Sequence, residues 1–94
     1  MSNKSECETN SIGTKRWYLN DELHREDGPA IVCANGDKYW YLNDELHRED
    51  GPAILCQNGT KLWYLNDKRV TEAEHTRRTQ VNIFVALHNK LKQI

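Results

Sequence analysis

A fifteen-residue segment, WYLNDELHREDGPAI, occupies residues 17–31 and recurs without a change at residues 40–54. The offset between the copies is 23 residues, and Trp63 lies a further 23 residues along the chain. A fixed period of this kind indicates an internal repeat, in which each unit adds the same structural element. The chain divides into a first unit at 13–35, a second at 36–58 and a third that stops after Arg69. About 2.5 units are therefore present, and any fold must accommodate them.

Each unit has the composition of two short hairpins. The runs KRWYL, KYWYL and KLWYL are rich in aromatic residues and end at Asn-Asp, a pair that suits a tight turn because Asn tolerates positive φ. A second apolar run, residues 30–33, ends at Asn35-Gly36, a strong signal for a two-residue hairpin. Pro29 lacks an N–H and marks a bend between the hairpins. The pattern predicts an antiparallel meander extended by repetition.

Alternation along the strands assigns side chains to two faces of this sheet. One face is predicted to be buried and free of charge; it holds Trp17, Leu19, Trp40, Leu42, Trp63 and Leu65. The other face includes Leu62 and is predicted to meet water. Its candidate partner-binding residues are Arg16, Tyr18, Tyr39, Tyr41 and Tyr64. Aromatic side chains repeated across a sheet can anchor a partner protein or stack on bases, and the alternative is simple cross-strand packing.

The last segment changes character. Thr71 and Glu74 have the spacing of a capping box, so a helix is predicted from about residue 72 to residue 92. Its apolar residues Phe84, Leu87 and Leu91 are expected either to pack on the sheet or to form an interface with a second copy. The predicted fold class is α+β, with a flexible N-terminal segment at 1–12, the β-repeat sheet at 13–70 and the C-terminal helix at 71–94.

Charge and composition exclude several classes of protein. The 94-residue chain has a formal net charge of −1, which disfavours binding to nucleic acid or to an anionic membrane. It has no run of about 20 apolar residues and no apolar signal-peptide core, so a cytoplasmic protein is expected. Three cysteines without CxxC spacing suggest reduced thiols.

Metal binding and catalysis are both disfavoured by the period of the repeat. Equivalent residues of successive hairpins lie two strands apart, about 9 to 10 Å, which is too far to share a zinc ion or to form a disulfide between Cys33 and Cys56. No metal, cofactor or catalytic residue is expected, because an acid-base constellation rarely recurs at a structural period. His24 and His47 are instead expected to form hydrogen bonds that hold their loops.

The units resemble the variant MORN-type repeat, with the approximate motif W-Y-x-N-G-K-x-H-R-x-D-G-P-A, found in proteins of bacteria, bacteriophages and large DNA viruses. The resemblance covers residues 13–69, and the exit from Leu65 to Glu72 is also similar to the family's usual passage into a helix. The matching residues are Trp17, Tyr18, Asn20, His24, Arg25 and Asp27 to Ala30, with Trp40, Tyr41, Asn43, His47, Arg48 and Asp50 to Ala53. The chain departs from the motif at Asp21, Asp44 and Asp67, where Gly is common. The resemblance implies a fold and a manner of binding rather than a reaction.

These features favour a non-enzymatic protein-binding module. Members of the resembled family are often labelled antitoxin components, so a small phage-type inhibitor or antitoxin, acting on a host defence enzyme, a nuclease or a toxin in the cytoplasm of the host, is the concrete form of this hypothesis. One alternative is a homo-oligomeric structural repeat protein. Another is nucleic-acid binding through the aromatic face.

Overall fold

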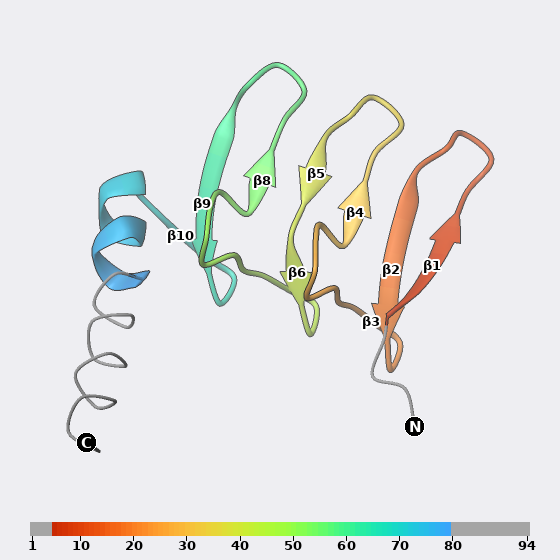
Figure 1. Cartoon of the computed structure of the whole chain (residues 1–94), viewed down its shortest axis with the longest axis horizontal. Coiled ribbons are helices and arrows are strands. Elements are labelled where there is room, and N and C mark those ends of the chain that lie inside the picture. The colour runs from red at the N-terminus through yellow and green to blue at the C-terminus, as the bar shows by residue number, and fades with distance from the viewer. Residues whose placement is uncertain (1–4, 80–94) are drawn as a thin grey trace, which may run out of the picture.

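A computed structural model describes residues 5–79, and it contains mostly antiparallel strands in a meander-like sheet with one C-terminal helix. Long hairpins stand side by side in a row, with residues 6–9 at one end of it and the helix at the other (Figure 1). The α+β class is therefore confirmed. Among these residues no helix is long and apolar enough to cross a membrane.

Ten strands make up the described sheets. They are β1 (Glu6–Thr9), β2 (Lys15–Leu19), β3 (Glu22–Leu23), β4 (Ile31–Val32), β5 (Lys38–Tyr39), β6 (Tyr41–Leu42), β7 (Glu45–Leu46), β8 (Ile54–Leu55), β9 (Lys61–Leu65) and β10 (Lys68–Val70). The main sheet has the order β1-β2-β4-β5-β8-β9-β10, with β3 also paired to β2. Strands β6 and β7 form a separate two-stranded ladder.

The Asn-Asp pairs form three equivalent tight turns. We call Asn20-Asp21 the first turn, Asn43-Asp44 the second and Asn66-Asp67 the third. Both residues of each turn have positive φ, 53° and 65° in the first turn, for example, as a two-residue type I′ turn requires. The Asp residues that replace the Gly of the motif therefore adopt the left-handed conformation that Gly would have adopted.

The hairpins at the opposite end differ from the sequence prediction. Asn35-Gly36 was expected to form a two-residue turn, but the loop is longer, because Cys33 N–H donates to Asp37 O at 2.8 Å and Gly36 N–H to Cys33 O at 2.9 Å. Gly36 has a φ of 100°, as in a type I turn followed by a left-handed residue. The segment is therefore a three-residue loop in which Gly supplies the positive φ.

In each of the first two units, the chain that returns from the Asn-Asp turn forms two short strands with a loop between them. Strand β3 pairs with the second half of β2 and β4 with the first half, while residues 24–30 leave the sheet between them. The chain re-enters at Ala30, whose carbonyl accepts Trp17 N–H at 2.8 Å, and Ala53 accepts Trp40 N–H in the same way. Both alanines are completely buried, at 0% exposure. The Gly-Pro-Ala of the motif therefore marks the point where only a small side chain fits.

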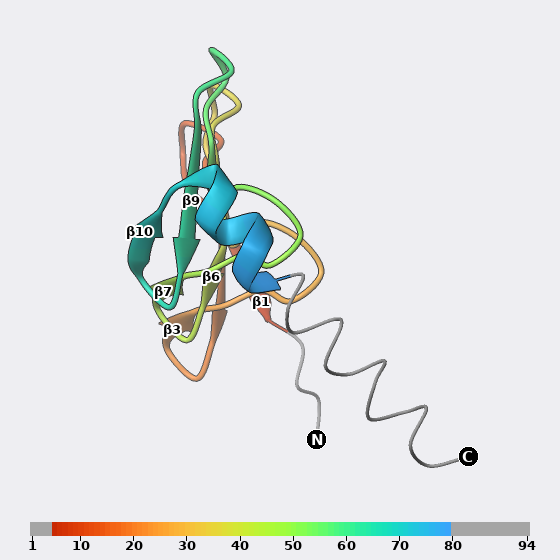
Figure 2. The same cartoon turned by 90° about the vertical axis from the view of Figure 1, so that its left-hand side faces the viewer.

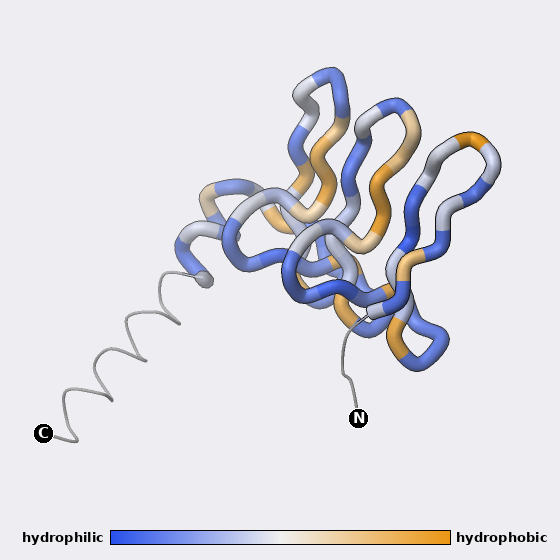
Figure 3. Tube along the Cα trace, turned by 45° about the vertical axis from the view of Figure 1, so that its right-hand side comes forward, coloured by the Kyte–Doolittle hydropathy of each residue, from blue (hydrophilic) through white to orange (hydrophobic). Residues whose placement is uncertain are grey.

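The core of this sheet is thin. Among the described residues the buried hydrophobic side chains are those of Ala30, Ala53 and Leu65, and the tryptophans are only half-buried. The most hydrophobic stretches lie along one arm of two of the hairpins, at β4 and β8, whereas the facing arms are mainly hydrophilic (Figure 3). The prediction of an uncharged tryptophan face was wrong, because Lys15, Lys38 and Lys61 lie two residues before each tryptophan and so project from the same face.

Both ends of the sheet carry additional structure. Residues 1–12 were expected to be flexible, but residues 6–9 form β1, which pairs along β2 from Thr9↔Lys15 to Glu6↔Tyr18. At the other end the predicted helix start at Thr71 is confirmed, since Glu74 N–H donates to Thr71 Oγ1 at 3.1 Å and helix begins at residue 72. Phe84, Leu87 and Leu91, which the sequence predicts to lie on a helix, are outside the described residues.

Candidate functional site

One face of the sheet carries an unbroken row of large side chains across five strands. The register places Arg16 opposite Ile31, Ile31 opposite Tyr39, Tyr39 opposite Ile54, and Ile54 opposite Leu62. Residues that face each other directly in an antiparallel ladder project to the same side, so these five side chains form one continuous strip. Sequence alternation had placed Arg16, Tyr39 and Leu62 here but gave no means of adding Ile31 and Ile54.

Tyr18, Tyr41 and Tyr64 lie two residues beyond this strip in β2, β6 and β9, and alternation puts them on the same side. The tyrosine face is defined here by these three residues together with the strip. Burial raises the pKa of Tyr41, and the nearby Asp67, Asp44 and Tyr64 raise it further. Burial also raises the pKa of Tyr39, with a smaller contribution from Cys33. The five predicted partner-binding residues are all half-buried and are brought onto one surface.

The tryptophan face is covered by the loops that interrupt the return strands. The guanidinium carbon of Arg25 lies 3.9 Å from the centre of the Trp17 ring, and Arg48 lies 3.9 Å from that of Trp40. Arg48 also donates to Asp50 Oδ1 at 3.0 Å and to Pro52 O at 3.1 Å. A Cβ at Gly51 would be 2.8 Å from the guanidinium carbon, so the cation is held between an aromatic ring and a bare backbone. The His-Arg-x-Asp-Gly-Pro sequence thus encodes a lid for the tryptophan.

The third tryptophan is covered differently, because the chain leaves the repeat before a third such loop. His75, in the helix, lies edge-on to Trp63 with ring centroids 6.5 Å apart. Its Nε2 is 2.5 Å from Arg48 O, and the residue is only 3% exposed. The sequence offered no signal for His75, because at helical spacing it falls on the side opposite the predicted apolar stripe of Phe84, Leu87 and Leu91. In the edge-on view the helix and both loops project to the same side of the hairpins (Figure 2).

The two repeated histidines form hydrogen bonds, as predicted, but these bonds connect one unit to the turn of the next. His24 Nδ1 accepts the Asn43 N–H at 3.0 Å, and His47 Nδ1 accepts the Asn66 N–H at 2.9 Å. These contacts are made 19 residues along the chain in both cases. The imidazoles therefore have a structural role in the stacking of the hairpins.

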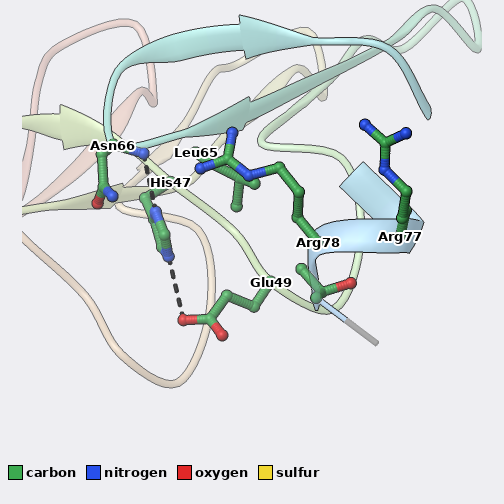
Figure 4. A pocket seen from close by; sticks show the side chains of 7 residues that line it. His47, Glu49, Leu65, Asn66, Arg77 and Arg78 are labelled. Atoms are coloured by element: carbon green, nitrogen blue, oxygen red, sulfur yellow. Dashed lines mark hydrogen bonds and ion pairs between the residues drawn. The ribbon is translucent and has the colours of Figure 1, made fainter. Parts of the chain in front are cut away.

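A cleft of about 580 Å³ lies between the loop that contains His47 and Glu49 and the helix. Figure 4 shows His47 between Asn66 and Glu49, with Arg77 and Arg78 reaching in from the helix. Glu49 Oε2 is 3.2 Å from His47 Nε2, so the acid and the imidazole of this cleft are already paired. Within the described part of the chain, Arg77 and Arg78 form no ion pair.

The described residues contain no group of three or more His, Cys, Asp or Glu side chains suited to hold a metal ion. Cys7, Cys33 and Cys56 are free thiols. Burial raises the pKa of the Cys33 thiol, Asp37 and Cys56 add to the rise, and Arg16 opposes it. This set of neighbours places Cys33 beside the strip of the tyrosine face.

Comparison with known proteins found no matching family model, no matching curated protein and no matching solved structure. The function of the chain is therefore inferred from its own geometry.

The raised pKa values of Tyr39 and Tyr41 predict a loss of stability at high pH. In the unfolded chain these phenols ionise near their ordinary pKa of 10.0, whereas the folded protein retains their protons to a higher pH. The free energy of unfolding should therefore fall as pH rises above about 10. Denaturant titrations across this range should show a smaller fall for the variant with Tyr39→Phe and Tyr41→Phe. An equal fall in the free energy of unfolding of both proteins would show that these phenols are not responsible. The Cys33→Ser variant controls for the thiol, whose pKa is also raised.

Proposed function

We propose that the protein is a non-enzymatic protein-binding module that uses its tyrosine face to cover a surface of a partner protein. The observation that carries this proposal is the strip from Arg16 to Leu62, which is continuous across five strands and bordered by three tyrosines. Tyrosine and arginine are enriched at protein interfaces, where large amphipathic side chains contribute most of the binding energy. Each 23-residue sequence unit adds equivalent strands and so extends this face.

The charges of the face favour a protein partner over a nucleic acid. The cations of the face are Arg16 and Arg69, which lies opposite Tyr64, and Glu8 and Glu6 of β1 lie opposite Arg16 and Tyr18. Asp44 and Asp67 also lie close enough to Tyr41 to raise its pKa. A surface that tracks a phosphate backbone would need several basic side chains along it. Binding of single-stranded nucleic acid through the tyrosines is accordingly the weaker alternative, and it would require an affinity that falls steeply with salt.

The polar groups of the repeated loops support a role without catalysis. His24 and His47 accept backbone hydrogen bonds, and Arg25 and Arg48 are stacked on tryptophans. A general acid or base must be free to reach a substrate proton, and these side chains are engaged in holding the hairpins together. The resemblance to variant MORN-type repeats adds the concrete form of the proposal, a small inhibitor or antitoxin that blocks a toxin, a nuclease or a host defence enzyme in the cytoplasm.

Homo-oligomerisation is the other alternative, and one observation bears on it. Strand β1 lies at the edge of the sheet, and all four of its residues are exposed. Exposed edges invite pairing with another strand, but short edges with charged side chains resist it. Glu6 and Glu8 would repel their counterparts in an antiparallel pair of identical edges, which makes self-association through β1 the weaker proposal.

A pair of photo-crosslinking variants tests the proposal. A photoreactive residue replaces Tyr41 in one protein and Lys38, on the opposite face, in the other. We expect the Tyr41 variant to capture a protein that then forms a complex of defined stoichiometry with the purified wild-type chain. Capture from Lys38 but not from Tyr41 would contradict the proposed face. A chain that remains monomeric and captures nothing from either position would contradict the proposed function.

A further inference from the structure

The side of the sheet opposite the tyrosine face carries a regular row of lysines. The register places Lys15 opposite Val32, Val32 opposite Lys38, Lys38 opposite Leu55, and Leu55 opposite Lys61. Side chains that face each other directly in an antiparallel ladder project to the same side. The lysines therefore recur on every second strand, about 9 to 10 Å apart, with one aliphatic side chain between neighbouring lysines. We call these five residues the lysine row.

The chain leaves the lysine row open to solvent. Its lysines are the first residues of β2, β5 and β9, which is the end of the hairpins away from the Asn-Asp turns. All three lysines are exposed. In the edge-on view the loops and the helix cover the lower part of the hairpins, and the upper part stands free (Figure 2). A ligand can therefore approach the row from the side on which the loops project.

The charges of the row are not neutralised by neighbouring acids. Within residues 5–79 none of the three lysines forms an ion pair. Asp37 directly precedes Lys38 and so projects to the tyrosine face, where Glu8 also lies. The exposed aspartates of the loops are paired with the arginines that cover the tryptophans. The row thus presents three positive charges to a partner.

The tryptophans on this side of the sheet do not provide a stacking platform for bases. The guanidinium groups of Arg25 and Arg48 lie over the rings of Trp17 and Trp40, and a histidine of the helix lies edge-on to the third ring. Proteins that bind single-stranded nucleic acid combine basic side chains with exposed aromatic rings on which bases stack. The row offers the charges and half-buried aliphatic side chains but no open ring, which favours an acidic polypeptide.

The spacing of the lysines matches one extended peptide conformation. A polyproline II helix rises about 3.1 Å per residue with about three residues per turn, so every third side chain projects to the same side at steps of about 9 Å. Side chains on one side of a β-strand recur at about 7 Å, which does not match the row. A polyproline II segment laid across the strands therefore places one side chain over each lysine.

We infer that the lysine row is a docking site for an extended acidic segment of another protein, in which a carboxylate recurs at every third residue. The carboxylates lie on the three lysines, and the chain between them passes over Val32 and Leu55. This site is independent of the proposed function, because it lies on the side of the sheet opposite the tyrosines and none of its contacts involves them.

A peptide titration followed by NMR on the full-length, ¹⁵N-labelled protein at low salt tests the inference. The probe is the capped peptide EPPEPPE, and the matched control EEEPPPP has the same composition with its glutamates contiguous. Exposed ion pairs are individually weak, so three of them correspond to a dissociation constant on the order of millimolar. We expect saturable shifts of the Val32, Lys38 and Leu55 amides, and an affinity for EPPEPPE at least about threefold higher than for EEEPPPP.

Two variants at exposed positions locate the binding. Lys38→Ala removes the central charge of the row and should weaken the binding of EPPEPPE about threefold. Lys68→Ala removes an exposed cation of β10 that is outside the row, so the affinity for EPPEPPE should stay at the wild-type value.

Four outcomes would overturn the inference. The first is no response of the three amides at several millimolar EPPEPPE. Equal affinities for the two peptides would show that the spacing of the lysines is not recognised. Equal weakening by Lys38→Ala and Lys68→Ala would reduce the binding to non-specific attraction. A single-stranded oligothymidylate of the same net charge that shifts these amides at lower concentrations than EPPEPPE would assign the row to nucleic acid.

Discussion

Replacing Ala53 with leucine should destabilise the protein by about 1 to 3 kcal/mol, because the site has no room for a larger side chain. Ala53 is completely buried, and its carbonyl is fixed by the Trp40 N–H at 2.8 Å. The chain re-enters the sheet here from the loop that covers Trp40, so a branched side chain would push the loop away from the ring. For a domain of this size each kcal/mol lowers the melting temperature by roughly 4 to 8 °C.

The matched control is Ala34→Leu, which places the same side chain at an exposed position in the loop after β4. We expect its melting temperature to stay within a few degrees of the wild-type value, because surface substitutions usually change stability by less than about 0.5 kcal/mol. Thermal unfolding followed by circular dichroism compares the two variants. Equal melting temperatures for Ala53→Leu and Ala34→Leu would show that the hairpins are not packed at Ala53 as described.

Replacing Arg48 with alanine should cost about 2 to 4 kcal/mol. The substitution removes the stacking on Trp40, leaves Pro52 O without its 3.1 Å partner and breaks the ion pair with Asp50. The ion pair contributes least, because Asp50 is exposed and such pairs are worth about 1 kcal/mol or less. The loss of stability should therefore persist at high salt, when the free energy of unfolding is measured by denaturant titration.

Two further variants separate the guanidinium plane from its charge. Arg48→Lys keeps the charge but cannot lie flat on the ring while bonding two acceptors, so it should recover only part of the loss. Arg69→Ala, at an exposed position of β10, should change the free energy of unfolding by less than about 0.5 kcal/mol. If Arg48→Lys were as stable as the wild type, the flat stacking of the guanidinium between Trp40 and Gly51 would not contribute to stability.

The local geometry of this fold could be predicted from the sequence, because turn chemistry and alternation are local properties. Asn20-Asp21 marked a tight turn, and Thr71 with Glu74 marked the start of a helix; both interpretations agree with the structure. The loop at Asn35-Gly36 was mistaken for a two-residue turn because the same dipeptide also serves in a longer loop, where Gly alone takes the positive φ.

Contacts between units could not be predicted, since they depend on register and on where the loops leave the sheet. The pairing of Ile31 with Tyr39 and of Tyr39 with Ile54, which completes the strip, results from the re-entry of the chain at the two buried alanines. The stacking of Arg48 on Trp40 was missed for a similar reason: a charged residue in a polar loop gives no sign that it covers an aromatic ring.

The most direct test of the central claim is the affinity of two triple variants for the partner captured through Tyr41. One variant changes Tyr18, Tyr41 and Tyr64 to alanine, and the other changes Lys15, Lys38 and Lys61, on the opposite face, to alanine. Because interface anchors commonly contribute about 2 kcal/mol or more, we expect the tyrosine variant to bind at least about 30-fold more weakly. The lysine variant should bind within about threefold of the wild type, provided that both variants remain folded by circular dichroism. A lysine variant that loses binding while the tyrosine variant retains it would contradict the proposal that the tyrosine face is the functional surface.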